Sequence, residues 1–158
     1  MNNDDVTPAT IRIAAMNFLS MREHSAKELY TKLAKKFDQT DWITASIEKL
    51  KNDGLQSDQR FAEAFVSMRL RQGKGALVIR LELKEKGVSD ALINQYLVHP
   101  EQETDWNALA LKAYRKKFGD SAIGDLKDKA RRIRFLTARG FSSTNIHYVF
   151  HHSAAKSD

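Results

Sequence analysis

The sequence contains no cysteine, only two prolines and only seven glycines among its 158 residues. The absence of cysteine excludes a disulfide framework, cysteine-ligated metal centres and thiol catalysis. An all-β protein of this length would need more turn-forming residues than the prolines and glycines present. No segment approaches the roughly 18 consecutive apolar residues that a membrane-spanning helix requires. We therefore expect an all-α protein without a membrane segment.

The residues that are abundant agree with this expectation. Hydrophobic residues make up 42% and charged residues 29% of the chain, so it can bury a core. Alanine, leucine, lysine, arginine and glutamate are frequent, and all five favour helices. The N-terminal segment is acidic and polar, unlike a secretory or mitochondrial leader. We expect a cytoplasmic location.

Helix-start signals and apolar spacing predict nine short helices in three sets of three. Proline follows Thr7 in the pattern typical of a first helical turn, and Ser25 with Glu28 forms a capping box. Further helix starts are predicted at Thr40, Ser57, Ser89, Thr104 and at Ser142 or Ser143. The eighth helix is predicted over 122–139, with Ile123, Leu126, Ala130, Ile133 and Leu136 buried.

Glycines and prolines predict where the segments end. Gly54 and Gly87 suit the left-handed position after a helix, Gly73-Lys74-Gly75 is interpreted as a flexible break, and His99-Pro100 ends the sixth helix. The resulting division is a flexible segment over 1–8, three-helix repeats over 9–55, 56–99 and 100–151, and a frayed tail over 152–158. Such tandem repeats predict an elongated, curved helical array that acts through long surfaces.

Signals for catalysis and for metal or cofactor binding are poor. Gly73-Lys74-Gly75 lacks the upstream glycine and the following hydroxyl of a phosphate-binding P-loop. His147 and His151 are spaced to share a helix face, but no third ligand lies at a metal-binding spacing. No glycine-flanked serine indicates a nucleophile. We expect no enzymatic activity, no metal and no cofactor.

Basic residues carry the strongest functional signal. The net charge is +6, and residues 101–158 hold eleven basic against seven acidic residues. A basic half predicts a polyanionic partner. Lys127, Arg131 and Arg134 are spaced to share one face of the eighth helix, where they suit a phosphate backbone or an acidic partner. The full set of candidate contacts is Arg69, Arg71, Lys74, Lys112, Arg115, Lys116, Lys117, Lys127, Arg131, Arg132, Arg134 and Arg139.

Two alternatives to this interpretation remain open at the level of single residues. Cations near a helix C-terminus offset the helix dipole, which accounts for Arg69 and Lys116 without any ligand. The joints at Gly87-Val88-Ser89 and Gly140-Phe141-Ser142 resemble helix-turn-helix turns, but the helices after them lack the side chains that read bases in the major groove. Contact with the nucleic-acid backbone or with its shape therefore fits better than sequence-specific recognition.

Four segments of the sequence form a recognisable set of motifs. The first comprises Ala14, Phe18-Leu19, Arg22, Ser25, Glu28-Leu29 and Lys32-Leu33. The most specific is Leu50-x3-Gly54-Leu55-x-Ser57-Asp58-x-Arg60-Phe61-Ala62-x2-Phe65-Val66-x2-Arg69. Two more are Gly75-x3-Ile79-x2-Glu82-Leu83-x2-Lys86-Gly87-Val88 and Arg134-Phe135-Leu136-x2-Arg139-Gly140-Phe141-Ser142. Together these segments resemble the RecX family, regulators of the RecA recombinase, over about residues 10–150.

The resemblance implies three tandem three-helix repeats and no enzymatic activity. It also implies a bacterial protein that binds RecA in the groove of its DNA filament, and that hinders filament extension, ATP hydrolysis, strand exchange and coprotease activity. Weak contact with single- and double-stranded DNA and a monomeric state are expected with it. The alternative interpretation is a plain helical DNA-binding module that recognises the phosphate backbone without sequence specificity. The two are separated by testing binding to RecA filaments beside binding to DNA alone.

Overall fold

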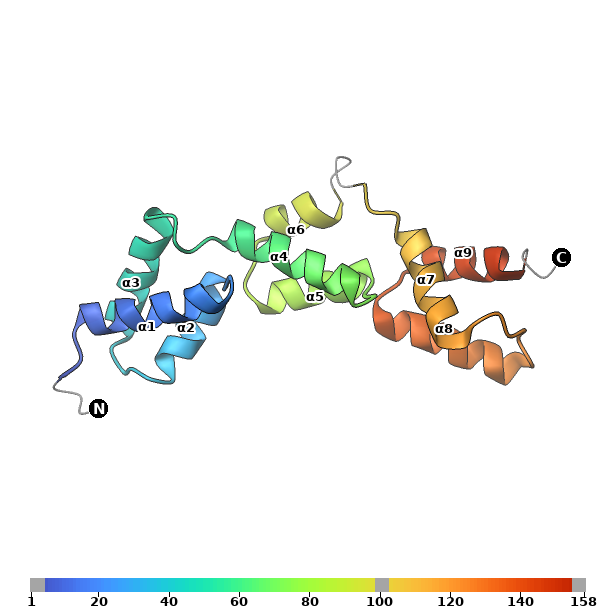
Figure 1. The fold of residues 1–158 in the computed structure, drawn as a ribbon, viewed down its shortest axis with the longest axis horizontal. Coiled ribbons are helices and arrows are strands. Elements are labelled where there is room, and N and C mark those ends of the chain that lie inside the picture. Colours follow the sequence, from blue (N-terminus) through green and yellow to red (C-terminus); the bar gives the residue numbers. More distant parts are fainter. Residues whose placement is uncertain (1–4, 99–102, 155–158) are drawn as a thin grey trace. The chain divides into compact units, whose positions relative to one another are not determined.

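The computed structural model describes residues 5–98 and 103–154, and this part of the chain is helical without any strand (Figure 1). The predicted stop of the sixth helix at His99-Pro100 lies outside the described residues. Residues 1–4 of the predicted N-terminal segment and 155–158 of the predicted tail also lie outside them. The helices are α1 (Pro8–Met21), α2 (Ala26–Ala34), α3 (Thr40–Asn52), α4 (Asp58–Arg71), α5 (Ala76–Glu85), α6 (Asp90–Leu97), α7 (Trp106–Phe118), α8 (Leu126–Arg139) and α9 (Ser143–Ala154). The all-α prediction is confirmed.

Most of the predicted caps are present. Thr7 and Ser25 both form capping boxes, and the hydroxyls of Ser57 and Ser89 accept hydrogen bonds from the backbone N–H groups of residues 60 and 92. Of the two serines proposed for the last helix, Ser142 is the cap, since its hydroxyl accepts from the N–H of Asn145. Each capping side chain accepts a hydrogen bond from a backbone N–H group that would otherwise have no partner at the start of the helix.

Four predicted helix ends are wrong. Thr40 is the first residue of α3, whose N-cap Gln39 makes no side-chain cap bond. Asp105 rather than Thr104 caps α7, because its carboxylate accepts from the N–H of Ala108. α8 begins only at Leu126, capped by Asp125, so Ile123 lies before the helix. α9 continues to Ala154, beyond the point where fraying was expected.

The chain divides into two compact units, each with its own core. The first comprises the residues up to Phe65 together with Leu83–Leu92, and the second comprises Val66–Glu82 together with the residues from Ile93 onward. In the first unit the inner faces of α1, α2 and α3 meet, as predicted. The fully or nearly fully buried residues there are Ile11, Ala15, Leu29, Leu33, Phe37, Ile43, Ile47 and Leu50.

The second unit has a core between α7, α8 and α9. Its buried apolar residues are Ala110, Tyr114, Leu136, Phe141, Ile146 and Val149, with Phe118, Ile133, Phe135 and Phe150 packed against them. Of the buried positions predicted for the eighth helix, only Leu136 is fully buried. Leu126 is 86% exposed and Ile123 is 40% exposed. The predicted start at 122 lies four residues before the observed one, so Ile123 precedes the helix and Leu126 is its first residue.

Within the first unit, a charged network joins α2 to the end of α5. The Glu28 carboxylate accepts hydrogen bonds from both terminal nitrogens of Arg22, at 3.2 and 3.0 Å, and forms an ion pair with Lys86 at 3.2 Å. Burial raises the pKa of Glu28, but the Arg22 and Ser25 hydrogen bonds, the Arg22 charge and Lys86 outweigh it and lower the pKa to about 2. We call these residues the Glu28 network.

His24 lies beside this network and is only 1% exposed. Its Nδ1 lies 3.0 Å from the backbone oxygen of Arg22, and its Nε2 lies 2.8 Å from the Lys32 ammonium. A neutral ring satisfies both contacts, donating from Nδ1 and accepting at Nε2. Burial lowers the pKa of His24, and the neighbouring charges of Arg22 and Lys32 lower it further. The ring therefore stays neutral at neutral pH.

Within the second unit, a contact between two glycines joins the start of α5 to the end of α8. The Gly75 N–H donates to the Arg139 carbonyl at 2.7 Å, and the Leu77 N–H donates to the Gly140 carbonyl at 3.0 Å. A Cβ on Gly75 would lie 2.4 Å from the Gly140 backbone. The predicted break between two helices is present at Gly73-Lys74-Gly75, but its last residue is held in place by the Gly75–Gly140 contact, contrary to the expected flexibility.

Candidate polyanion-binding cleft

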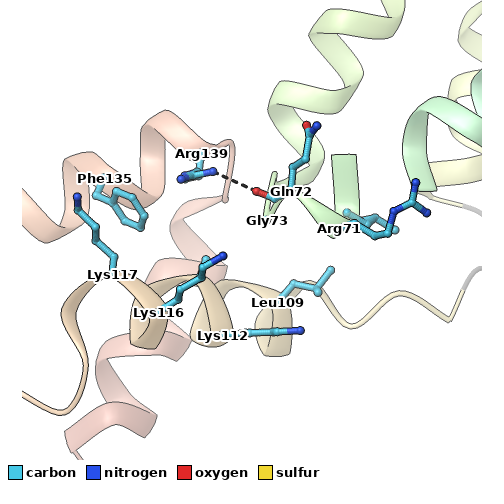
Figure 2. A pocket seen from close by; sticks show the side chains of 11 residues that line it. Arg71, Gln72, Gly73, Leu109, Lys112, Lys116, Lys117, Phe135 and Arg139 are labelled. Atoms are coloured by element: carbon cyan, nitrogen blue, oxygen red, sulfur yellow. Dashed lines mark hydrogen bonds between the residues drawn. The ribbon is translucent and has the colours of Figure 1, made fainter. Parts of the chain in front are cut away.

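A cleft of about 280 Å³ opens in the second unit, between the end of α4, one face of α7 and the last turns of α8. Five of its lining residues are cations and none is a carboxylate. The lining residues are Leu70, Arg71, Gln72, Gly73, Leu109, Lys112, Ala113, Lys116, Lys117, Phe135 and Arg139 (Figure 2). Such a concentration of one sign of charge makes the cleft attractive to anions.

Helical spacing explains why these residues face the same space. Leu109, Lys112, Ala113 and Lys116 follow the spacing of one helix face, and the Asp105 cap fixes where α7 begins. Phe135 and Arg139 are four residues apart on α8. The Arg139 guanidinium also donates to the backbone carbonyl of Gln72 at 3.1 Å, which ties the end of α8 to the end of α4 (Figure 2).

Two lysines of the cleft lack the neutralising partners that several other cations of the chain have. Among the described residues, Lys112 and Lys116 have neither an ion pair nor a hydrogen bond through their ammonium groups. By contrast, Arg12 pairs with Asp53, Arg60 with Glu23 and Lys84 with Asp90. Like charges this close repel one another until an anion enters. The cleft is therefore arranged for a negatively charged ligand rather than for internal ion pairing.

The structure brings five of the twelve predicted contact residues into this cleft. They are Arg71, Lys112, Lys116, Lys117 and Arg139. Arg115, Lys127 and Arg134 do not line it, and neither does Lys74, which is half-buried beside the Gly75–Gly140 contact. Arg69 forms an ion pair with Glu82. Arg69 and Lys116 both lie in the last turn of their helices, where the alternative of offsetting the helix dipole places them, but only Lys116 also lines the cleft.

Arg132 is not a surface residue, contrary to its selection as a contact candidate. Its side chain is only 3% exposed. The guanidinium donates to the Tyr114 hydroxyl at 2.7 Å and to the Ser121 backbone carbonyl at 2.9 Å, and it forms an ion pair with Asp128 at 3.0 Å. Arg132 therefore fastens the segment between α7 and α8 to the core and is not available to a partner.

The predicted stripe on α8 is partly neutralised by its own helix. Arg131 pairs with Asp128 at 2.8 Å, while Lys127 and Arg134 are exposed. A hydrogen bond from the Gly124 N–H, followed by bonds from Arg131 and Arg132, lowers the pKa of Asp128 to about 2. Asp128 thus stays ionised and competes with any anion for Arg131. This stripe is a weaker candidate than the cleft.

Phe135 is the cleft residue that sequence reasoning missed. Its ring centroid lies 5.9 Å from the Lys117 ammonium and 5.3 Å from the Arg139 guanidinium (Figure 2). The sequence held one signal, the spacing of four residues between Phe135 and Arg139, which places an aromatic ring and a cation on one helix face. In the sequence Phe135 is noted only as part of a family motif, so its place beside cations was not predicted.

Family models match three consecutive stretches of the chain. Residues 12–50 match the first three-helix domain of RecX, residues 57–97 the second and residues 103–150 the third. The chain belongs to the RecX family. The resemblance inferred from the motifs is thereby confirmed, as is the organisation in three tandem three-helix domains. The matched stretches fall inside the repeats predicted over 9–55, 56–99 and 100–151, whose boundaries themselves stay predictions.

Individual RecX proteins agree with this assignment. The chain is 38% identical over 153 residues to the regulatory protein RecX of Chromohalobacter salexigens, covering 97% of each chain. It is 33% identical to that of Halorhodospira halophila, covering 92% of this chain and 89% of the relative. The crystal structure of RecX from Lactobacillus salivarius shares the fold at a TM-score of 0.73 and 22% identity, over 94% of this chain and 97% of the other.

No helix among the described residues is both long and apolar enough to cross a membrane. They also contain no cluster of three or more histidine, aspartate or glutamate side chains placed to hold a metal ion. The His152 ring stacks on Tyr148 with 3.7 Å between centroids, which gives it a packing role.

Proposed function

We propose that this RecX-family chain is a non-catalytic regulator of homologous recombination that binds RecA and the groove of the RecA–DNA filament. Bound there, it hinders filament extension, ATP hydrolysis, strand exchange and coprotease activity. The proposal rests on membership of a family whose members are named regulatory proteins and on the match of all three RecX domains in order. We propose further that it acts in the cytoplasm, as a monomer.

The basic cleft supplies the contact in this proposal. A RecA filament carries DNA phosphates, and the cleft offers lysines without internal partners together with a fixed guanidinium. A polyanion would relieve the repulsion between these cations, so binding and charge neutralisation favour each other. The proposed contact is therefore electrostatic and should weaken as salt concentration rises.

RecA ATPase activity on single-stranded DNA provides the direct test. Wild-type protein at amounts equal to or below that of RecA should lower the rate. The double variant Lys112→Gln/Lys116→Gln should lose most of this suppression, because it removes two unpaired cations without adding repulsion. The matched control is Lys49→Gln/Lys51→Gln, which removes two exposed cations of α3 and should suppress like wild type. An unchanged ATPase rate with folded wild-type protein would contradict the proposal.

The same variants separate the regulator from the alternative of a plain DNA-binding module. Each phosphate contact contributes about 0.7 to 0.9 to the slope of log affinity against log salt. If DNA alone is the partner, the cleft variant should lose DNA binding with a slope flatter by about 1.4 to 1.8, and wild type should suppress ATPase only by competing for DNA. Suppression that persists when DNA sites are in excess excludes the plain module.

A further inference from the structure

The lining of the cleft combines two kinds of surface, and only one of them suits a phosphate. Lys112 and Lys116 on α7 provide positive charge without internal partners. The same cleft is lined by the apolar side chains of Leu70, Leu109 and Ala113 and by the ring of Phe135. A phosphate backbone alone needs no apolar surface. The ligand that matches both parts carries an anionic group and an apolar, flat group close together.

Phe135 gives the apolar part its character. The ring is half-buried and is held from one side by Phe118, whose centroid lies 5.3 Å away in an edge-to-face arrangement. The Arg139 guanidinium lies 5.3 Å from the Phe135 centroid and is fixed by its bond to the Gln72 carbonyl. An aromatic ring with a positioned guanidinium is the usual platform for a nucleobase, which stacks on either plane.

The size of the cleft limits what can occupy it. Its volume of about 280 Å³ lies just below the range of about 300 to 1,000 Å³ that is usual for pockets enclosing a small molecule. A DNA duplex presents phosphates outside and keeps its bases stacked inside, so it can place charge at the cleft entrance but no base within it. A nucleotide with an unpaired base can present both groups at once.

We propose that the cleft holds a single nucleotide whose base is unpaired. The phosphate lies against Lys112 and Lys116, and the base packs against Phe135 and the neighbouring apolar side chains. This proposal deepens the proposed function. It rests on that function in one respect, because the DNA of a RecA filament is the expected source of the unpaired nucleotide. The same chemistry is offered by an unpaired nucleotide within a strand and by a free nucleotide, and the experiment distinguishes the two.

The test compares ligands that differ in the base but not in the backbone. Fluorescence anisotropy measures binding of the full chain to a labelled oligothymidylate of about 12 nucleotides, to an abasic strand of equal length and to a duplex of equal length. The phosphates of the two single strands are the same, so any difference between them comes from the bases. We expect the abasic strand to bind roughly 5- to 100-fold more weakly than oligothymidylate. The duplex should also bind more weakly than oligothymidylate.

Two variants separate the contribution of the base from that of the phosphate. Phe135→Leu keeps an apolar side chain against Phe118 but removes the ring, so it should reduce oligothymidylate binding and leave abasic-strand binding unchanged. Lys112→Gln/Lys116→Gln should reduce binding to both strands. Lys49→Gln/Lys51→Gln on α3 is the matched control and should change neither. The comparison of strands on wild-type protein needs no variant, so it decides the proposal even if Phe135→Leu is unstable.

The outcomes separate this proposal from the proposed function. Equal affinity for the abasic strand and oligothymidylate, or for duplex and oligothymidylate, overturns the base-binding cleft. RecA ATPase suppression that persists in that case leaves the proposed function standing. Free thymidine monophosphate is added as a competitor. Displacement of oligothymidylate by the mononucleotide extends the site to free nucleotides, and failure to displace it limits the supported ligand to a nucleotide within a strand.

Discussion

The two units of this chain use different chemistry to fix α5, the helix whose two ends belong to different units. In the first unit the end of α5 is held by side-chain charges, since Lys86 pairs with Glu28. In the second unit the start of α5 is held by backbone atoms, through the hydrogen bonds of Gly75 and Leu77 to the end of α8. Charges respond to protons and salt, whereas a backbone contact responds chiefly to shape. The contact in the first unit should therefore be sensitive to pH and salt, and the contact in the second unit to added side-chain volume.

The largest effect is expected from adding a methyl group at the Gly75–Gly140 contact. Gly75→Ala would place Cβ 2.4 Å from backbone atoms that cannot rotate away. Gly140→Ala would meet the Val78 Cβ at 2.6 Å and also adopt a φ of +100°. Each variant should lose about 3 kcal/mol or more of unfolding free energy, measured by urea denaturation.

Gly73→Ala is the control for this prediction. Gly73 has a φ of +76° but no atom within 4 Å of an added Cβ. It should lose only about 1 to 2 kcal/mol, the cost of the backbone conformation alone. Equal losses at Gly73 and Gly75 would mean that backbone conformation, not the close approach to Gly140, explains the requirement for glycine.

A smaller effect is expected at the Glu28 network. Glu28→Gln keeps the shape of the side chain but removes the charge that Arg22 and Lys86 share, at an expected cost of about 1 to 3 kcal/mol. Because the pKa of Glu28 is lowered to about 2 from an ordinary value of 4.5, its contribution is fully present above pH 4.5. That contribution is lost as the pH falls through about 2.

Unfolding free energy measured against pH tests this assignment. The wild type should lose stability between pH 4.5 and 2 more steeply than Glu28→Gln. Asp128 in the second unit also has its pKa lowered to about 2, so it contributes to the slope of both proteins alike. Identical slopes for the two proteins would show that Glu28 does not act through its charge.

The smallest effect concerns His24 and occupies a separate pH range. Burial lowers the pKa of His24 below its ordinary value of 6.5, so the folded protein binds this proton more weakly than the unfolded chain. Its contribution is present above pH 6.5 and declines as the pH falls below that value. His24→Gln should remove the part of the pH dependence of unfolding free energy that this group causes as the pH falls below 6.5. If the profile of unfolding free energy against pH is the same in His24→Gln and wild type, the pH dependence in this range does not come from His24.

Local sequence signals predicted local structure well. The inner faces of α1, α2 and α3 and the serine caps follow from spacing and from the hydrogen-bonding capacity of a hydroxyl, both of which are properties of neighbouring residues. The helix start predicted at Thr104 is wrong because the neighbouring Asp105 can cap the helix equally well, and its carboxylate does so. The start predicted at Thr40 is wrong for another reason, since α3 begins after Gln39 without any side-chain cap.

The cleft was predictable only in part, because it is assembled from distant positions. Basic residues could be listed from the sequence, but Arg71, Lys112 and Arg139 come together only through the packing of three helices. Burial of Arg132 could not be foreseen either, since a long side chain can reach inward to Tyr114 and Ser121 from a helix that looks charged throughout. Gly75 gave no signal beyond a helix break, because its partner lies 65 residues further along the chain.

The Gly75–Gly140 contact also determines which kinds of sequence change the second unit can accept. Its hydrogen bonds come from the main chain, so exchanging neighbouring side chains leaves every donor and acceptor in place. Adding or deleting one residue between the end of α4 and Gly75 would instead offer a different peptide group to Arg139. The connection is therefore fixed in length, and its composition can vary at Gln72 and Lys74 but not at Gly73, whose φ of +76° requires glycine. A change of length there should uncouple α5 from α8 even when each helix still forms.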